Sequence, residues 1–164
     1  KKMQYLFDSI YNKLEKKGYF IGSFRNRLFN LYSLNRFTIN ELKNKNVEKL
    51  LEEAILINKL KTSELIKKNY INKKFKNISH PETGGVKVNT RYQYTPLQII
   101  DKLKKEKFET KYIYPINLHL VNPKIKDKKN LEILKHSALK FYVDKRINSL
   151  IFQSSTFMVL AQKK

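Results

Sequence analysis

The sequence predicts an α/β protein in which helices and strands alternate. Apolar residues recur at helical spacing over residues 3–14, and residues 19–24 have the length and composition of a short buried strand. Gly18 separates these two segments and follows Lys16 and Lys17, which suit the last turn of a helix. Helix, glycine and strand in this order are typical of a parallel sheet covered by helices. With 164 residues, we expect one such domain or part of one.

A less regular region follows this first unit. Residues 25–38 mix polar and aromatic side chains without a clear period, and we expect an ordered loop at the carboxyl end of the strand. Thr38 is predicted to cap a long helix that reaches about residue 61, with Glu41 completing a capping box. Residues 62–92 form the least regular stretch of the chain.

Regular patterns resume after residue 94. Thr95 is a good N-cap and Pro96 suits the first helical position, so a helix is predicted from there to about residue 103. A β-rich run covers residues 110–120, and Pro115 within it implies an edge strand, a bulge or a break.

The C-terminal third is predicted to hold one more helix and one more strand. The helix covers residues 131–142, and residues 151–161 form a strand rich in Phe, Val, Leu and Thr. We expect residues 19–24, 110–118 and 152–161 to share one sheet, with the last strand antiparallel to its neighbours.

The composition excludes several classes of site and of membrane segment. The chain has no cysteine, which excludes disulfides, cysteine-ligated zinc and cysteine nucleophiles and suits a reducing, cytoplasmic compartment. No apolar run approaches the roughly 18 residues of a membrane-spanning helix, and the first residues lack the apolar core of a signal peptide. The chain does not begin with Met, so we expect the middle of a longer chain or a processed product.

The formal net charge of +21 allows two interpretations. Such a charge is common in nucleic-acid-binding proteins. However, the cations are overwhelmingly Lys, which accompanies abundant Asn, Ile and Tyr as in proteins of AT-rich genomes. Arg, the preferred residue for bidentate phosphate and base contacts, is scarce. We therefore interpret the charge mainly as a result of composition.

Three segments of the sequence resemble motifs of the class I S-adenosylmethionine-dependent methyltransferases. Residues 14–23 are similar to the helix, glycine and strand motif that precedes the fifth strand in that family. Residues 94–109 are similar to the motif of threonine, proline and helix that precedes its sixth strand. Residues 155–163 look like the terminal strand. One position departs from the pattern, because Lys107 stands where the family usually has Gly. The resemblance implies the C-terminal part of a Rossmann-like methyltransferase sheet, with a helical insertion at about residues 40–90.

This resemblance implies a function for a longer protein. The expected activity is transfer of a methyl group from S-adenosylmethionine to a small-molecule or carbohydrate-type acceptor. The Gly-rich loop that holds the cofactor in such enzymes is absent, since Gly84 and Gly85 are the only paired glycines. We therefore expect residues 1–164 to be the C-terminal portion of the domain, inactive alone, with the cofactor-binding N-terminal half missing. The alternatives are a basic nucleic-acid-binding protein of ribosomal or organellar type and a scaffold fragment without activity.

Four residues are candidates for acceptor binding. Arg25 and Asn26 follow the first predicted strand, where open α/β sheets bind ligands, although Asn26 and the adjacent Arg27 can equally fix the turn. Asn35 lies in the same segment, and His119 at the end of a later strand can act as a base near neutral pH. No group of residues has metal-ligand spacing, so we expect no metal.

Overall fold

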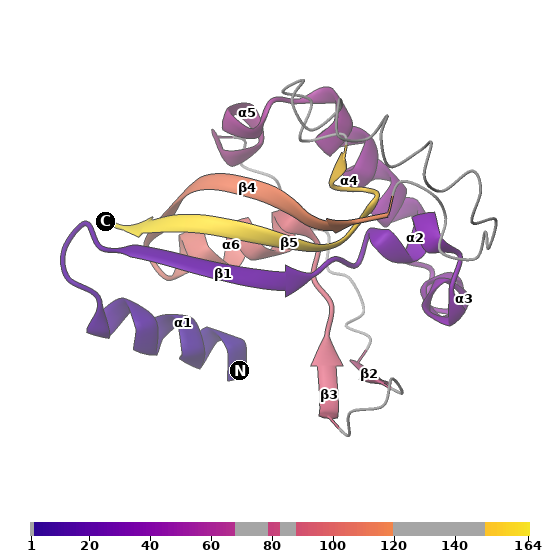
Figure 1. The fold of residues 1–164 in the computed structure, drawn as a ribbon, viewed down its shortest axis with the longest axis horizontal. Helices are drawn as coiled ribbons and strands as arrows, with labels where there is room; N and C mark the ends of the chain where they lie inside the picture. Colours follow the sequence, from indigo (N-terminus) through magenta and orange to yellow (C-terminus); the bar gives the residue numbers. More distant parts are fainter. Residues whose placement is uncertain (1, 68–78, 83–87, 120–149) are drawn as a thin grey trace.

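The computed structural model describes residues 2–67, 79–82, 88–119 and 150–164. The elements in these ranges, shown in Figure 1, are α1 (Lys2–Lys13), β1 (Tyr19–Arg25), α2 (Phe29–Ser33), α3 (Arg36–Lys43), α4 (Val47–Lys59), α5 (Thr62–Lys67), β2 (Ser79–Glu82), β3 (Val88–Tyr92), α6 (Pro96–Lys105), β4 (Phe108–Leu118) and β5 (Ser154–Lys163). The chain is thus a mixed α/β protein. The predicted helix over residues 131–142 lies outside the described residues.

The central feature is a three-stranded sheet with the order β1-β5-β4. β5 is antiparallel to both neighbours, so β1 and β4 run in the same direction, as their arrows show in Figure 1. This confirms that the three predicted strand segments share one sheet and that the last one is antiparallel to its neighbours. Pro115 lies on β4, which is an edge strand of this sheet. An edge position suits proline because proline has no backbone N–H to donate to a second neighbouring strand. β2 and β3 form a separate antiparallel pair.

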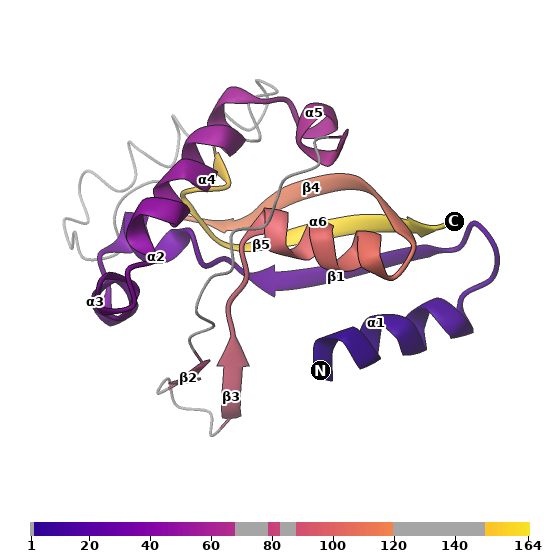
Figure 2. The same ribbon diagram turned by 180° about the vertical axis from the view of Figure 1, so that it is seen from behind.

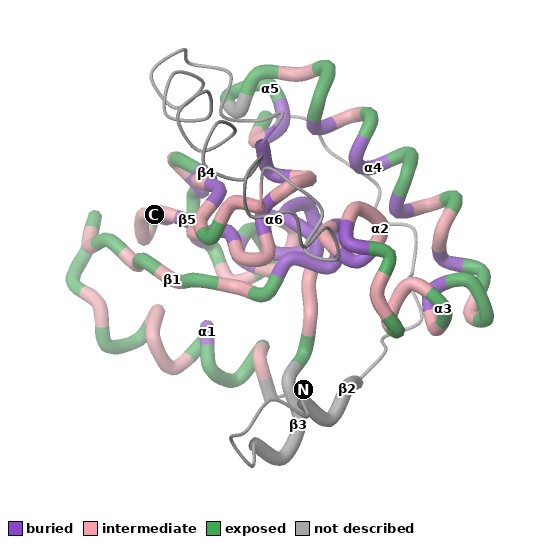
Figure 3. The backbone as a smooth tube through the Cα atoms, turned by 45° about the vertical axis from the view of Figure 1, so that its right-hand side comes forward, coloured by how far each residue is buried: buried purple, intermediate pink, exposed green. Residues whose placement is uncertain are grey.

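One face of the sheet forms the core with α1 and α6 (Figure 2). Phe157, Val159 and Ala161 of β5 are fully buried, at 0% exposure. The Phe7 ring of α1 packs edge-on against Phe20 of β1, with centroids 5.8 Å apart. Burying such a side chain contributes about 2 kcal/mol, so these contacts stabilise the packing of the sheet against the helices. Figure 3 shows the resulting contrast between the buried α6 and the partly exposed α1 and β1.

The predicted start of α6 is confirmed in detail. The Thr95 hydroxyl accepts a hydrogen bond from the Gln98 N–H at 3.2 Å, and Gln98 Oε1 accepts one from the Thr95 N–H at 3.0 Å. Pro96 occupies the first helical position, where its missing N–H leaves no unsatisfied donor. This capping box is the only predicted helix start that the structure reproduces with its partners, among those the described residues include.

The structure corrects the region predicted as a loop followed by one long helix. Residues 25–38 contain α2 and the beginning of α3, and Asn35 rather than Thr38 is the cap, with its Oδ1 accepting from the Phe37 N–H at 2.7 Å. The long helix is two helices, α3 and α4, separated by Lys45 with a left-handed φ of 55°. A helix cannot continue through that conformation, and the flanking asparagines favour such breaks.

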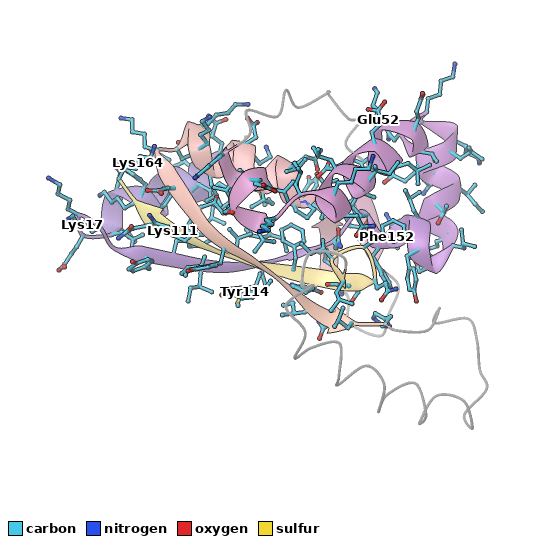
Figure 4. All side chains as sticks on the ribbon, turned by 90° about the horizontal axis from the view of Figure 1, so that it is seen from above. Lys17, Glu52, Lys111, Tyr114, Phe152 and Lys164 are labelled. Atoms are coloured by element: carbon cyan, nitrogen blue, oxygen red, sulfur yellow. The ribbon has the colours of Figure 1, made fainter. Side chains whose placement is uncertain are left out.

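Among the described residues, the second face of the sheet carries several exposed side chains and no helix. We call it the outer face and define it by Tyr19, Ile21, Tyr112, Tyr114, Met158 and Leu160, which the strand register places on one side. Ile21 is 63% exposed and Tyr112 is 53% exposed. Figure 4 shows Tyr114 on the side of the sheet away from the helices. β1, predicted as a buried strand, is therefore half-buried on its inner face and exposed on its outer face.

Lys107 adopts a backbone conformation that glycine prefers. It joins α6 to β4 with a φ of 64°. L-residues with a side chain reach this left-handed region at a cost of about 1–2 kcal/mol, whereas glycine reaches it freely. The position at which the sequence departs from the methyltransferase phrase is thus one where glycine is the better residue.

Candidate functional site

The carboxyl ends of β1 and β4 lie at the same end of the sheet (Figure 1). Arg25, the last residue of β1, and Ile116 of β4 both lie opposite Thr156 near the start of β5. Ligands of open α/β sheets bind beyond this end of same-direction strands. α2 follows β1 directly and brings its side chains to this end.

Four partly exposed rings meet there, and we call Phe29, Tyr32, His119 and Phe152 the aromatic cluster. The Phe29 ring lies 4.8 Å from the imidazole of His119, at an angle of 37°. Tyr32 lies 5.9 Å from Phe29 and meets Phe152 edge-on at 6.0 Å. The rings come from three separate segments of the chain: α2, the end of β4 and the start of β5. Flat, apolar walls with a few polar groups are typical of small-molecule sites.

His119 supplies the titratable group of this cluster. Its backbone N–H donates to the Gln153 carbonyl at 3.0 Å, which fixes the residue beside β5. Burial lowers the pKa of the His119 imidazole from its ordinary value of 6.5, so the ring is mainly neutral near pH 7. A neutral imidazole can accept a proton from a bound hydroxyl or amine.

Asn26 has a structural role that uses its whole amide group. The side chain is 1% exposed, and its Nδ2 donates to the carbonyls of Ile151 at 2.6 Å and Ser154 at 2.9 Å. Its Oδ1 accepts from the Leu28 N–H at 3.0 Å. These bonds join the turn after β1 to the turn before β5. Binding of the acceptor by Asn26 stays a prediction.

Arg27 is also buried and forms an ion pair with Glu41 of α3. Its Nε and Nη2 donate to the two carboxylate oxygens at 2.6 and 2.7 Å, and the side chains are 2% and 0% exposed. Asn46 Nδ2 adds a third bond to Glu41 at 3.0 Å. The pair joins the turn after β1 to α3, which accounts for a guanidinium in this loop without a ligand.

The two other predicted residues, Arg25 and Asn35, lie on either side of Phe29 and Tyr32 in the sequence. Arg25 is exposed at the end of β1. Asn35 caps α3, and its Nδ2 donates to the Ser33 hydroxyl at 2.7 Å, so its amide group is engaged within the loop. The structure thus brings Arg25, Asn26 and His119 to one end of the sheet and gives Asn26 and Asn35 internal hydrogen bonds.

Sequence reasoning missed the buried acids and most of the aromatic cluster. Glu41 was interpreted as part of a capping box, although it is the partner of Arg27. Glu53 lies on the stripe of Leu50, Ala54 and Ile57 that faces the core, and a carboxyl on such a stripe is a signal that was available in the sequence. Nothing local in the sequence marks the contact between Phe29 and His119.

The described glycines do not form a cradle of the kind that holds S-adenosylmethionine. Two of the four glycines are described, and neither opens a cradle: a Cβ on Gly18 would meet the Glu15 carbonyl at 2.9 Å, and one on Gly22 would meet the Phe20 ring at 2.5 Å. The described part of the chain also has no group of three metal-ligating side chains. Within the same ranges, no helix is long and apolar enough to cross a membrane.

No protein-family model matches the chain, and no curated protein matches it.

Proposed function

We propose that this chain is the acceptor-binding portion of an S-adenosylmethionine-dependent methyltransferase that acts on a small-molecule or carbohydrate-type substrate. The observation that carries the proposal is the placement of β5, which runs antiparallel between two strands of common direction. An antiparallel last strand is also what the resemblance to the methyltransferases implies. The left-handed Lys107, at a position where the family has Gly, also supports the proposal.

The uncovered surfaces agree with a chain that forms part of a larger domain. β1 is an edge strand of the described sheet, and the bridge between Asn26 and Tyr94 lies just beyond its last residue. The outer face and the exposed Tyr5 of α1, at 75%, add apolar area around that edge. In the mostly parallel sheets that the resemblance implies, helices cover both faces. The proposal assigns the cofactor, the remaining strands and the covering helices to the portion that is missing here.

In this proposal the chain positions the acceptor and receives its proton. The aromatic cluster holds a ring of the acceptor, and Arg25 lies at the same end of the sheet, as the last residue of β1. The neutral imidazole of His119 accepts the proton that the attacking oxygen or nitrogen loses when it takes the methyl group. General-base removal of a proton contributes about 100- to 10,000-fold to a rate.

The test is a methyl-transfer assay on the full reading frame that contains this chain, with labelled S-adenosylmethionine and a panel of hydroxylated and amino acceptors. His119→Gln is expected to lower kcat by about 100-fold or more and to remove the acidic limb of the pH profile. Lys111→Gln, away from this end of the sheet, is the matched control. Absence of methyl transfer to any acceptor by the full protein would refute the function.

A second experiment addresses the missing half. Titration calorimetry of residues 1–164 with S-adenosylmethionine is expected to show no binding, because the described residues offer no cradle. Micromolar affinity for this chain would show that the cofactor site lies within it.

The outer face also supports a second candidate, binding of single-stranded nucleic acid. Tyr112 and Tyr114 lie side by side there, with ring centroids 5.8 Å apart, and the chain carries a net charge of +21. Bases stack on such rings at about 1–3 kcal/mol each, and phosphates bind lysines in a salt-dependent way.

Competition binding at physiological salt separates the two candidates. For the methyltransferase portion, a labelled single-stranded oligonucleotide and heparin are expected to compete equally and weakly. Nanomolar preference for one nucleic acid, lost in Tyr112→Ala, would favour the second candidate instead.

A further inference from the structure

Glu53 is a buried carboxyl group on the side of α4 that faces the core. Its side chain is 0% exposed, and its helix neighbours Leu50 and Ile57 belong to the core cluster. Transfer of a carboxyl group to such a place is unfavourable unless specific contacts offset it. The contacts of its two oxygens therefore define what the residue does.

The first oxygen completes the N-terminus of α6. Glu53 Oε1 accepts a hydrogen bond from the Leu97 N–H at 3.0 Å, across 44 residues of sequence. The other N–H groups of this turn are already accounted for: Pro96 has none, Gln98 donates to the Thr95 hydroxyl and Ile99 donates to the Thr95 carbonyl. Glu53 thus supplies the one acceptor that α6 lacks.

The second oxygen is buried without a hydrogen-bond partner among the described atoms. Two groups with polar side chains face the carboxyl: the Thr95 hydroxyl at the start of α6 and the Arg27 guanidinium in the turn after β1. Arg27 is already paired in bidentate fashion with Glu41 of α3. Glu53 therefore has no counter-ion of its own.

These surroundings place the titration of Glu53 in the physiological range. Burial raises the pKa of its carboxyl from 4.5 to about 7, against the lowering effects of the Thr95 hydroxyl, the Leu97 N–H and the Arg27 charge. The folded arrangement consequently favours the protonated carboxyl, and deprotonation favours any arrangement in which water reaches the second oxygen.

The segment that Glu53 holds also forms the end of β1. The Tyr94 N–H donates to the Arg25 carbonyl at 3.0 Å, and the Arg27 N–H donates to the Tyr94 carbonyl at 3.0 Å. Asn30 Nδ2 of α2 donates to Gln93 Oε1 at 2.6 Å. Residues 93–97 therefore connect Glu53 to the turn that leads into the aromatic cluster.

We propose that Glu53 is a proton-linked positioning residue: its carboxyl, when protonated, holds the N-terminus of α6 and residues 93–97 against the end of β1, and its deprotonation releases them. The turn after β1 and α2 then lose a neighbour as the pH rises above neutrality. This inference does not depend on the reaction that the site performs.

Hydrogen exchange of the Leu97 amide, followed by NMR, tests the proposal. The Glu53 carboxyl titrates near 7 when it is buried and near 4.5 when it is hydrated. By linkage, the protection factor of the Leu97 amide, corrected for intrinsic exchange, should fall about tenfold between about pH 6 and pH 8. Glu53→Gln, which keeps the shape and cannot ionise, is expected to abolish this fall. A constant protection factor in the wild-type chain, or a fall that persists in Glu53→Gln, would overturn the proposal.

Three controls make the result specific. Glu52→Gln changes the adjacent, exposed carboxyl and should keep the tenfold fall; loss of the fall there would assign the effect to the wrong residue. The protection factor of the Leu97 amide is also compared with that of Val159 in the central strand. If the two are equal at every pH, only global unfolding is observed, which contradicts a local role of Glu53. Should Glu53→Gln fail to fold, the carboxyl carbon of Glu53 in the wild-type chain must titrate near 7, and a midpoint near 4.5 refutes the proposal.

Discussion

Removal of Arg27 should destabilise this protein more than removal of any exposed cation. In Arg27→Met the apolar stem stays, while the Glu41 carboxylate, 0% exposed, loses both guanidinium bonds at 2.6 and 2.7 Å. Loss of one partner of a buried pair costs about 3–5 kcal/mol, because the other charge remains buried without compensation. Domains of this size are stable by about 5–15 kcal/mol in total, so the variant loses a large part of its stability.

Urea unfolding followed by circular dichroism measures this loss. With a slope of about 2 kcal/mol per molar urea, the midpoint should fall by about 2 M. Lys105→Met removes the exposed pair with Asp101, whose Nζ–Oδ2 distance is 2.7 Å, and should cost less than about 0.5 kcal/mol. The double variant Arg27→Met with Glu41→Leu should cost much less than the two single changes combined, since it leaves no buried charge. Additive costs, or a loss below about 1 kcal/mol in Arg27→Met, would refute the reasoning.

Four further changes have defined expected outcomes. Lys107→Gly should raise the midpoint of thermal unfolding by relieving the φ of 64°, a gain of about 0.5–1 kcal/mol. Thr95→Ala should cost about 1 kcal/mol in urea, because α6 loses its cap. Ile21→Lys, at 63% exposure, should change stability by less than about 0.5 kcal/mol while it weakens binding of an apolar dye to the outer face. The stability that the raised pKa of Glu53 provides is fully present below pH 4.5 and is lost as the pH rises through about 7. The free energy of unfolding of Glu53→Gln should therefore rise by up to about 3 kcal/mol relative to that of the wild type between pH 4.5 and pH 8. Urea unfolding at each pH measures this difference.

Sequence patterns predicted the elements whose signals are local. α1 and α6 carry complete apolar stripes, which can be recognised from spacing. Thr95, Pro96 and Gln98 lie within one turn of each other, so the N-terminal cap of α6 can also be recognised from the sequence alone. The three strand segments were found from composition, and Pro115 indicated an edge strand, a bulge or a break because a proline cannot donate to a neighbouring strand. Within the candidate site, the same local reasoning predicted Arg25, Asn26, Asn35 and His119 as acceptor-binding residues, which stays a prediction, and it did not identify what surrounds them.

The remaining features depend on residues that are distant in the sequence. Arg27 meets Glu41 across 14 residues, Glu53 meets Leu97 across 44 and Asn26 meets Ile151 across 125. A carboxyl group on a helix has the same local pattern whether it caps a turn, faces water or enters the core. Only the packing of α3 and α4 against the end of β1 decides among these environments. By itself the sequence therefore determined α1, the start of α6 and the three strand segments of the sheet, through local spacing and hydrophobicity. Tertiary structure alone decided which acids are buried and which rings meet, because burial and partners exist only once distant segments pack together.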